Sequence, residues 1–194
     1  TCDIAQSSRE IKAQELELIR KNGREVSEFK TAIDGLAVIV HPSNPVSRLT
    51  IDQLSGLFTG KFSNWKDLGG NDGKILILSR ERNSGTHVYF LEHVLRKGQE
   101  KGPEEFAARV LMLPSSQSIA EEVAQSPEAI GYLGIGYVSE RHKLIAVSRS
   151  DGGPFVLPSV QAAQSGSYPI SRPLLMYASG APSGLVKSFI DFVL

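Results

Sequence analysis

The chain has 194 residues, 41% of them hydrophobic, and its 21 acidic and 21 basic residues leave no net charge. Such a chain is expected to fold around a substantial core, either as one large domain or as two small lobes. The balanced charge argues against a nucleic-acid or anionic-lipid partner, and apolar runs such as residues 36–40 are far shorter than the roughly 18 residues of a membrane span, so no transmembrane segment is expected in this chain.

The N-terminal part predicts a strand followed by a helix. Residues Cys2–Ala5 are typical of a strand, and Cys2, the single cysteine, is expected in the core. The run Ser7–Glu10 has the features of a helix start, and the strong helix formers after it continue to Asn22, where Gly23 ends the predicted helix. This order places two hydroxyls and an arginine in the loop between a strand and a helix.

Two apolar runs and a capping box come next. Residues 28–33 and 36–41 predict two strands, and the Asp34-Gly35 pair between them favours a tight hairpin turn. Thr50–Gln53 matches a capping box, which opens a helix that ends near Gly60.

A strand predicted at residues 75–78 runs into the sequence Arg80-Glu81-Arg82-Asn83-Ser84-Gly85-Thr86. Ser84 is a good N-cap residue, Gly85 lets a ligand approach the backbone, and Thr86 adds a hydroxyl beside the first helical N–H groups. A phosphate-like oxyanion fits such a turn, and Arg80 could bind two of its oxygens. From the spacing alone, an ordinary capped helix with a solvent-exposed arginine is an equally good interpretation.

Helices and strands continue to alternate beyond Gly98, which indicates an α/β chain. The predicted helices span residues 104–111, 118–125, 158–164 and 183–193, and the predicted strands span residues 130–133, 143–147 and 174–178.

The other chemically suggestive residues favour structural roles. Trp65 is interpreted as a core residue rather than a ligand-stacking platform, and His87 as a first-turn helical residue rather than a ligand. The histidines lack the spacing of a zinc site, and neither a nucleophile elbow nor a nucleotide-binding phosphate loop occurs. We therefore expect no catalytic residue, metal or cofactor.

The pattern R-x-x-x-S-G-T at Arg80–Thr86, with Phe90 four residues on, resembles the phosphate-binding proteins that serve phosphate ABC transporters. Several flanking stretches carry the same resemblance, in the order of that family and over nearly the whole chain. They are DIAQSSREIK, DGLAVIVHPSNP, LTIDQLSGLFTGKFSNWKDLGG, AIGYLGIGYV and YPISRPLLMY.

The resemblance implies a type II periplasmic-binding-protein-like fold, in which two crossing strands join two α/β lobes and the anion lies in the cleft between them. Residues 43–171 would form one complete lobe. Residues 1–42 and 172–194 would form the other, which would lack its N-terminal part. The crossing strands would lie at residues 36–42 and 172–175 and act as a hinge.

The resemblance also implies two groups of phosphate contacts. One comprises Arg80, Ser84, Gly85 and Thr86, and the other comprises Ser7, Ser8 and Arg9. In a common version of the family an aspartate stands at the position of Ser8 and accepts the proton of hydrogen phosphate. Sulfate carries no such proton, so this carboxylate rejects sulfate by charge repulsion. Serine cannot repel sulfate, although relatives with serine and arginine in this loop keep phosphate the leading ligand.

The implied function is therefore the capture of inorganic phosphate and its delivery to the membrane subunits of an ABC importer, in the periplasm or outside the cell. Any export signal or membrane anchor would lie upstream of this chain. Three alternatives remain open: binding of sulfate, molybdate or another tetrahedral oxyanion; a phosphate-sensing or adhesion module; and an enzyme that acts on phosphoesters.

Overall fold

The computed structural model describes residues 2–99 and 101–194. Thr1, the first residue of the lobe segment expected at residues 1–42, therefore lies outside the described residues. The chain forms two compact units. Unit 1 contains the residues up to Asp34 together with Arg172–Leu194, and unit 2 contains Gly35–Ser171. The sequence expectation placed the first boundary after residue 42. Within the described residues, no helix has both the length and the apolar character needed to cross a bilayer.

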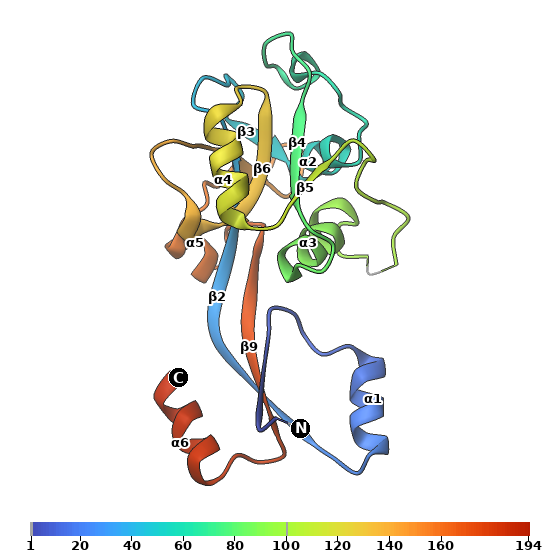
Figure 1. The fold of residues 1–194 in the computed structure, drawn as a ribbon, viewed down its shortest axis with the longest axis vertical. Helices are drawn as coiled ribbons and strands as arrows, with labels where there is room; N and C mark the ends of the chain where they lie inside the picture. Colours follow the sequence, from blue (N-terminus) through green and yellow to red (C-terminus); the bar gives the residue numbers. More distant parts are fainter. Residues whose placement is uncertain (1, 100) are drawn as a thin grey trace. The chain divides into compact units, whose positions relative to one another are not determined.

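Unit 1 is a small sheet with two helices (Figure 1). Strand β1 (Ile4–Ser7) pairs antiparallel with β9 (Ser171–Ser179), so that Ile4 lies opposite Ala178. On its other side, β9 neighbours β2 (Val26–Val40), whose first part belongs to this unit. The helices are α1 (Ala13–Lys21) and α6 (Gly184–Val193).

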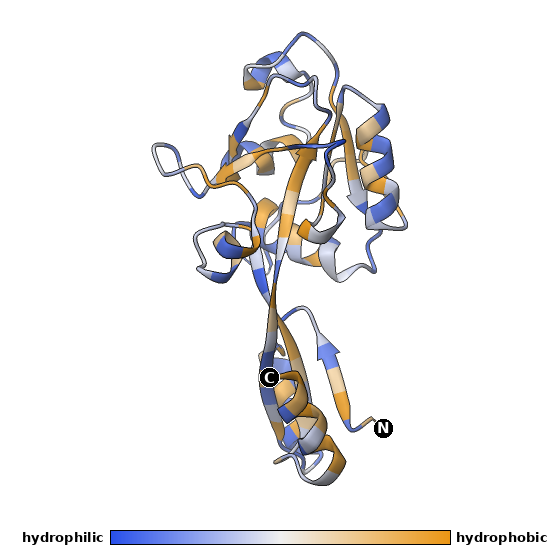
Figure 2. Ribbon diagram, turned by 90° about the vertical axis from the view of Figure 1, so that its left-hand side faces the viewer, coloured by the Kyte–Doolittle hydropathy of each residue, from blue (hydrophilic) through white to orange (hydrophobic). Residues whose placement is uncertain are grey.

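Few side chains are buried in unit 1. Helix α1 has no buried residue, and the single buried residue of α6 is Ile190. Figure 2 shows hydrophobic residues along α6. Two residues of this helix are largely exposed: Leu185 at 89% and Phe192 at 86%. Cys2 is exposed, so the prediction of a core cysteine is wrong. It precedes β1 and does not take part in that strand.

Helix α1 begins later than predicted, because the serine expected to open it is engaged elsewhere. The Ser7 hydroxyl donates to the Arg9 carbonyl oxygen at 2.7 Å and accepts from the Arg9 N–H at 3.2 Å. The start at Ala13 is instead stabilised by the Glu15 carboxylate, which accepts from the Lys12 N–H at 2.9 Å. The predicted end is confirmed, since Gly23 follows the helix with a φ of 66°.

The predicted hairpin at Asp34-Gly35 is wrong, because β2 continues through both residues as one strand of 15 residues. Asp34 accepts two bonds from Arg172 of β9, at 3.1 and 2.9 Å. Gly35 lies in close packing rather than in a turn: a Cβ there would meet Cδ1 of Ile135, so that side chain would have to shift. An aspartate-glycine pair thus serves an ion pair and a tight contact inside a strand.

Unit 2 is built on a mixed sheet. The second part of β2 pairs antiparallel with β6 (Ala129–Gly134) and with β7 (Lys143–Leu144). Strand β6 is parallel to β4 (Leu76–Arg80), which is parallel to β5 (Leu111–Leu113). A separate parallel pair joins β3 (Arg48–Thr50) and β8 (Ala146–Ser148). The helical segments are α2 (Ile51–Phe58), η1 (Trp65–Leu68), α3 (Gly85–Phe90), η2 (Leu91–Leu95), α4 (Ser116–Gln125), η3 (Ile135–Tyr137) and α5 (Val160–Gln164).

The buried apolar residues of unit 2 form two clusters, and alternate residues of β2 contribute to different ones. Leu36 and Val38 belong to the larger cluster, whereas Ala37 and Ile39 belong to the smaller one. Helix α4 completes the smaller cluster with buried residues such as Ile119. The alternation follows from strand geometry, in which successive side chains point to opposite faces of a sheet. The expected α/β fold is therefore confirmed.

Some of the helices and strands predicted for unit 2 from local sequence patterns are confirmed, and others are wrong. The capping box is confirmed: the Thr50 N–H donates to Gln53 Oε1 at 2.9 Å, and the Gln53 N–H donates to Thr50 Oγ1 at 3.2 Å. The helix predicted at 104–111 is wrong, because tertiary contacts occupy that backbone. The Ala107 N–H donates to the Phe58 carbonyl oxygen, and β5 begins at Leu111. The strand predicted at 143–147 is divided between β7 and β8.

Candidate anion-binding site

The sequence Arg80–Thr86 forms the predicted strand, turn and helix. Arg80 is the last residue of β4, and α3 begins at Gly85. Between them, the Ser84 N–H donates to the Glu81 carbonyl oxygen at 3.0 Å, which closes a tight turn. Ser84 is the N-cap residue, and its Oγ accepts from the Thr86 N–H at 3.2 Å. All four residues predicted for this group belong to this strand, turn and helix segment of unit 2.

The Arg80 side chain is held at its far end. Its Nη2 donates to the Pro114 carbonyl oxygen at 3.0 Å, and its Nη1 donates to Ser116 Oγ at 3.4 Å, at the start of α4. Its Nε is buried and has no hydrogen-bond partner among the residues that the structure describes. A buried donor without a partner is costly, because it has lost its bonds to water and gained none in exchange. An oxyanion could supply the missing acceptor.

A buried polar cluster lies behind the turn. It consists of Ser79 of β4, His87 of α3 and Tyr132 of β6, each at most 3% exposed, and we call it the buried trio. His87 lies in the first turn of its helix, as predicted, and its ring stacks on Phe106 with centroids 4.4 Å apart. Sequence reasoning missed Ser79 and Tyr132. The available signal was a serine inside an otherwise apolar strand, directly before the arginine.

The second predicted group lies in one loop of unit 1. The Arg9 guanidinium forms a two-pronged ion pair with Glu15, with bonds of 2.9 and 2.7 Å. The hydrogen bonds from Arg9 are the main reason that the pKa of Glu15 falls to about 2. Ser7 and Ser8 line a hollow of about 310 Å³ with Thr31 and neighbouring residues of β9. Arg9 is thus strongly engaged within its own unit.

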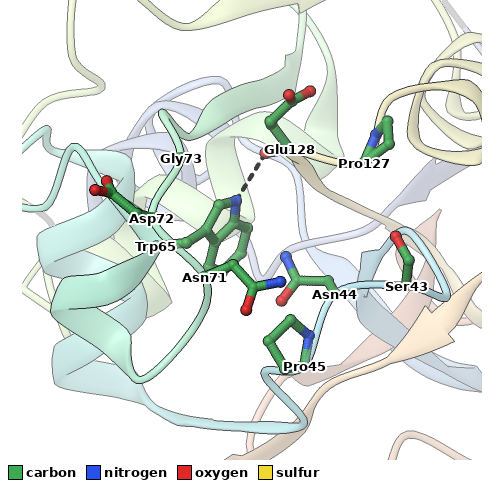
Figure 3. Close-up of a pocket in the computed structure, with 9 residues that line it drawn as sticks. All are labelled: Ser43, Asn44, Pro45, Trp65, Asn71, Asp72, Gly73, Pro127 and Glu128. Atoms are coloured by element: carbon green, nitrogen blue, oxygen red, sulfur yellow. Dashed lines mark hydrogen bonds between the residues drawn. The ribbon is translucent and has the colours of Figure 1, made fainter.

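A separate pocket of about 170 Å³ lies at the other end of the unit 2 strands (Figure 3). Its lining includes Gly73, shortly before β4, and Glu128, directly before β6, whereas Arg80 lies where β4 ends. Trp65 at this pocket is 3% exposed and donates through Nε1 to the Glu128 carbonyl oxygen at 2.9 Å. The interpretation of Trp65 as a core residue is therefore confirmed.

Residues 2–99 and 101–194 contain no group of three or more histidine, cysteine, aspartate or glutamate side chains that could hold a metal ion. The Arg80–Thr86 segment carries hydroxyls and a guanidinium instead. These groups suit a bound anion.

Known proteins resemble this chain along its whole length. A family model described as a PBP superfamily domain matches residues 1–194. The phosphate-binding protein PstS of Pseudomonas aeruginosa is 34% identical over 196 residues, which cover 94% of this chain and 59% of that protein. The chain therefore spans less than two thirds of this curated relative.

Solved structures agree with the family match. An ABC-type phosphate transport receptor from Vibrio cholerae superposes with a TM-score of 0.80 and 30% identity, over 98% of this chain and 73% of that one. A Clostridium perfringens protein crystallised with bound phosphate has a TM-score of 0.76 and 34% identity, over 98% of this chain and 72% of that one. The chain belongs to the PBP superfamily, within the family of phosphate-binding proteins of ABC transporters.

Proposed function

We propose that this protein captures inorganic phosphate for delivery to an ABC importer. The family supports a binding protein rather than an enzyme, and the named relatives include a phosphate-binding protein and a phosphate transport receptor. On this proposal, the protein works outside the cytoplasmic membrane and its protein partner is the membrane part of the importer. Affinity comes from several charge-assisted hydrogen bonds to a dehydrated oxyanion.

The observation that carries the proposal is the buried Arg80 Nε without an acceptor among the described residues. The guanidinium ends are held by Pro114 and Ser116, so the side chain is already oriented before a ligand arrives. A phosphate oxygen would satisfy Nε, and the neighbouring Ser84, Gly85 and Thr86 are proposed to contact the same anion. Ser7, Ser8 and Arg9 remain the predicted contacts from unit 1.

Ser8 favours a second candidate function, the binding of tetrahedral oxyanions more broadly. A serine hydroxyl can donate to sulfate as well as to phosphate, so this position lacks the repulsion that a carboxylate would provide. Sulfate competition separates the candidates. A phosphate protein keeps its affinity in excess sulfate, whereas a broader oxyanion protein loses it in proportion to the sulfate concentration.

Isothermal titration calorimetry at pH 7 tests the proposed function. Wild-type protein should bind phosphate, and Arg80→Ala should weaken binding roughly tenfold or more, because one or more hydrogen bonds to a charged group are lost. Arg141→Ala is the matched control, since it removes an exposed arginine from the same unit. Absence of phosphate binding by the wild type would refute the function. Unchanged affinity in Arg80→Ala would remove this residue from the site.

A further inference from the structure

The buried trio connects three chain segments at one hydroxyl. Ser79 Oγ lies 2.7 Å from the Tyr132 hydroxyl and 3.1 Å from His87 Nδ1, and it donates to the Arg80 carbonyl oxygen at 3.1 Å. A serine hydroxyl has one proton and two lone pairs. With its proton on the Arg80 carbonyl oxygen, it accepts from Tyr132 and from a His87 ring that carries its proton on Nδ1. These partners use its full hydrogen-bonding capacity.

Aromatic packing fixes the two rings of the trio. The Tyr132 ring stacks on Phe90 with centroids 3.8 Å apart, and the His87 ring stacks on Phe106. The rings therefore have little freedom to turn away from Ser79. A fully satisfied polar network in a low-dielectric interior specifies one geometry more strictly than apolar packing does.

Burial keeps the trio neutral. Burial lowers the pKa of His87, although the Arg80 main chain partly opposes this, with smaller effects from Arg82 and Glu105. Burial likewise raises the pKa of Tyr132. At pH 7 both rings are uncharged, so the trio supplies no charge to an anion. Its contribution must be geometric.

We propose that the buried trio is a positioning device for the anion turn, which ties the backbone of Arg80 to the first turn of α3 and so sets the spacing between Arg80 and Thr86. The trio holds the near end of Arg80, while Pro114 and Ser116 hold its far end. The effect on affinity rests on the proposed function, whereas the effect on the orientation of Arg80 does not.

Tyr132→Phe is the central test variant, because it removes one oxygen and keeps the stacked ring. Tyr168→Phe is its matched control. Tyr168 is equally buried in the same unit, and its hydroxyl donates to the Leu36 carbonyl oxygen at 2.8 Å, outside the trio. His87→Phe keeps an aromatic ring on Phe106 and removes the bond, and His87→Asn restores a polar atom near the Nδ1 position.

Two readouts are needed: phosphate affinity by calorimetry, and the NMR signal of the Arg80 Nε–H in ligand-free protein. Tyr132→Phe and His87→Phe should weaken binding roughly three- to tenfold, the range for one lost neutral hydrogen bond, and should shift the Arg80 signal. His87→Asn should recover most of the affinity. Tyr168→Phe should lose stability without changing affinity or the Arg80 signal.

Two results would overturn the positioning role: a Tyr132→Phe protein with wild-type affinity and an unmoved Arg80 signal, or a Tyr168→Phe protein that loses as much affinity. If the wild type binds no phosphate, the proposed function fails, and the Arg80 signal of ligand-free Tyr132→Phe alone decides the positioning role. If His87→Phe does not fold, Ser79→Ala replaces it with the same expected losses.

Discussion

The two predicted anion loops are built differently. The Arg80–Thr86 turn rests on a buried trio and on the larger of two apolar clusters, and its arginine keeps one buried donor without an acceptor among the described residues. The Ser7–Arg9 loop lies in a unit whose helix α1 buries no residue, and its arginine is paired with Glu15. If both loops bind the anion as proposed, the Arg80 side chain is oriented in advance, whereas Arg9 is already paired with Glu15.

This difference separates two ways of holding an arginine. Arg80 is oriented by a carbonyl oxygen and a hydroxyl, neither of which carries a charge that compensates its own. Arg9 is oriented by a carboxylate, which compensates the charge. We expect Arg80 to contribute more to affinity, because it pays a smaller cost in bonds broken when the anion binds.

The largest expected effect concerns the stability of unit 1. Asp34→Ala removes the carboxylate that binds Arg172, whose side chain is 6% exposed. Removing one partner of a fully buried pair costs about 3–5 kcal/mol in the free energy of unfolding, and because the Asp34 side chain is 26% exposed we expect a loss near the lower end of that range. Urea denaturation measures it. Asp191→Ala breaks the exposed pair with Lys187 and should cost less than about 1 kcal/mol; equal losses would show that the Asp34 pair has no special role.

Thr86→Val should weaken phosphate binding roughly tenfold while keeping the shape of the side chain, because one hydrogen bond to a charged ligand is lost. Calorimetry at pH 7 measures the change. Thr59→Val serves as the control, since the Thr59 hydroxyl donates to the Ser55 carbonyl oxygen at the C-terminal end of α2. If both variants bind phosphate as the wild type does, Thr86 does not contact the anion.

The pH dependence of stability should reveal the buried His87. Burial lowers its pKa in the folded protein, so the unfolded chain binds the proton more readily. Stability is therefore highest above the unfolded value of about 6.5 and falls as the pH drops from there towards the folded pKa. Urea denaturation at about pH 7.5 and about pH 5.5, on either side of the unfolded pKa of about 6.5, measures this change. Between these two pH values, His87→Phe should lose less of its free energy of unfolding than the wild type does. An equal loss would place the titration elsewhere.

The smallest expected effect tests the loop of unit 1. Glu15→Gln removes the charge that competes for Arg9, and phosphate binding should become tighter by roughly twofold, in line with the small energies of partly exposed ion pairs. Calorimetry at low ionic strength gives the best sensitivity, because salt screens the pair. Weaker binding would mean that Glu15 holds Arg9 in its binding position instead of competing for it.

Short-range sequence patterns predicted the Arg80–Thr86 turn better than the long-range contacts elsewhere in the fold. The Ser84 cap and the Thr50–Gln53 box depend on neighbouring residues, so the sequence shows them directly. The role of Gly35 depends on Ile135, and the conformation of residues 104–110 depends partly on a bond to Phe58, both far away in the chain. Turn and helix patterns could not predict these contacts.

The same limit applies to the predicted binding residues and the side chains around them. The sequence placed Arg80 at the end of a strand and Ser84 at a helix start, and both are confirmed. It could not show that Ser79, His87 and Tyr132 meet, because 53 positions separate Ser79 from Tyr132. Nor could it show that Arg9 pairs with Glu15, since both side chains are long and partly exposed.

A crystal structure of the protein with phosphate tests the central claim most directly. The account predicts a phosphate oxygen within hydrogen-bond distance of Arg80 Nε, with the same anion in contact with the Ser84–Thr86 turn. Phosphate bound elsewhere, with Arg80 Nε still lacking an acceptor, would contradict it.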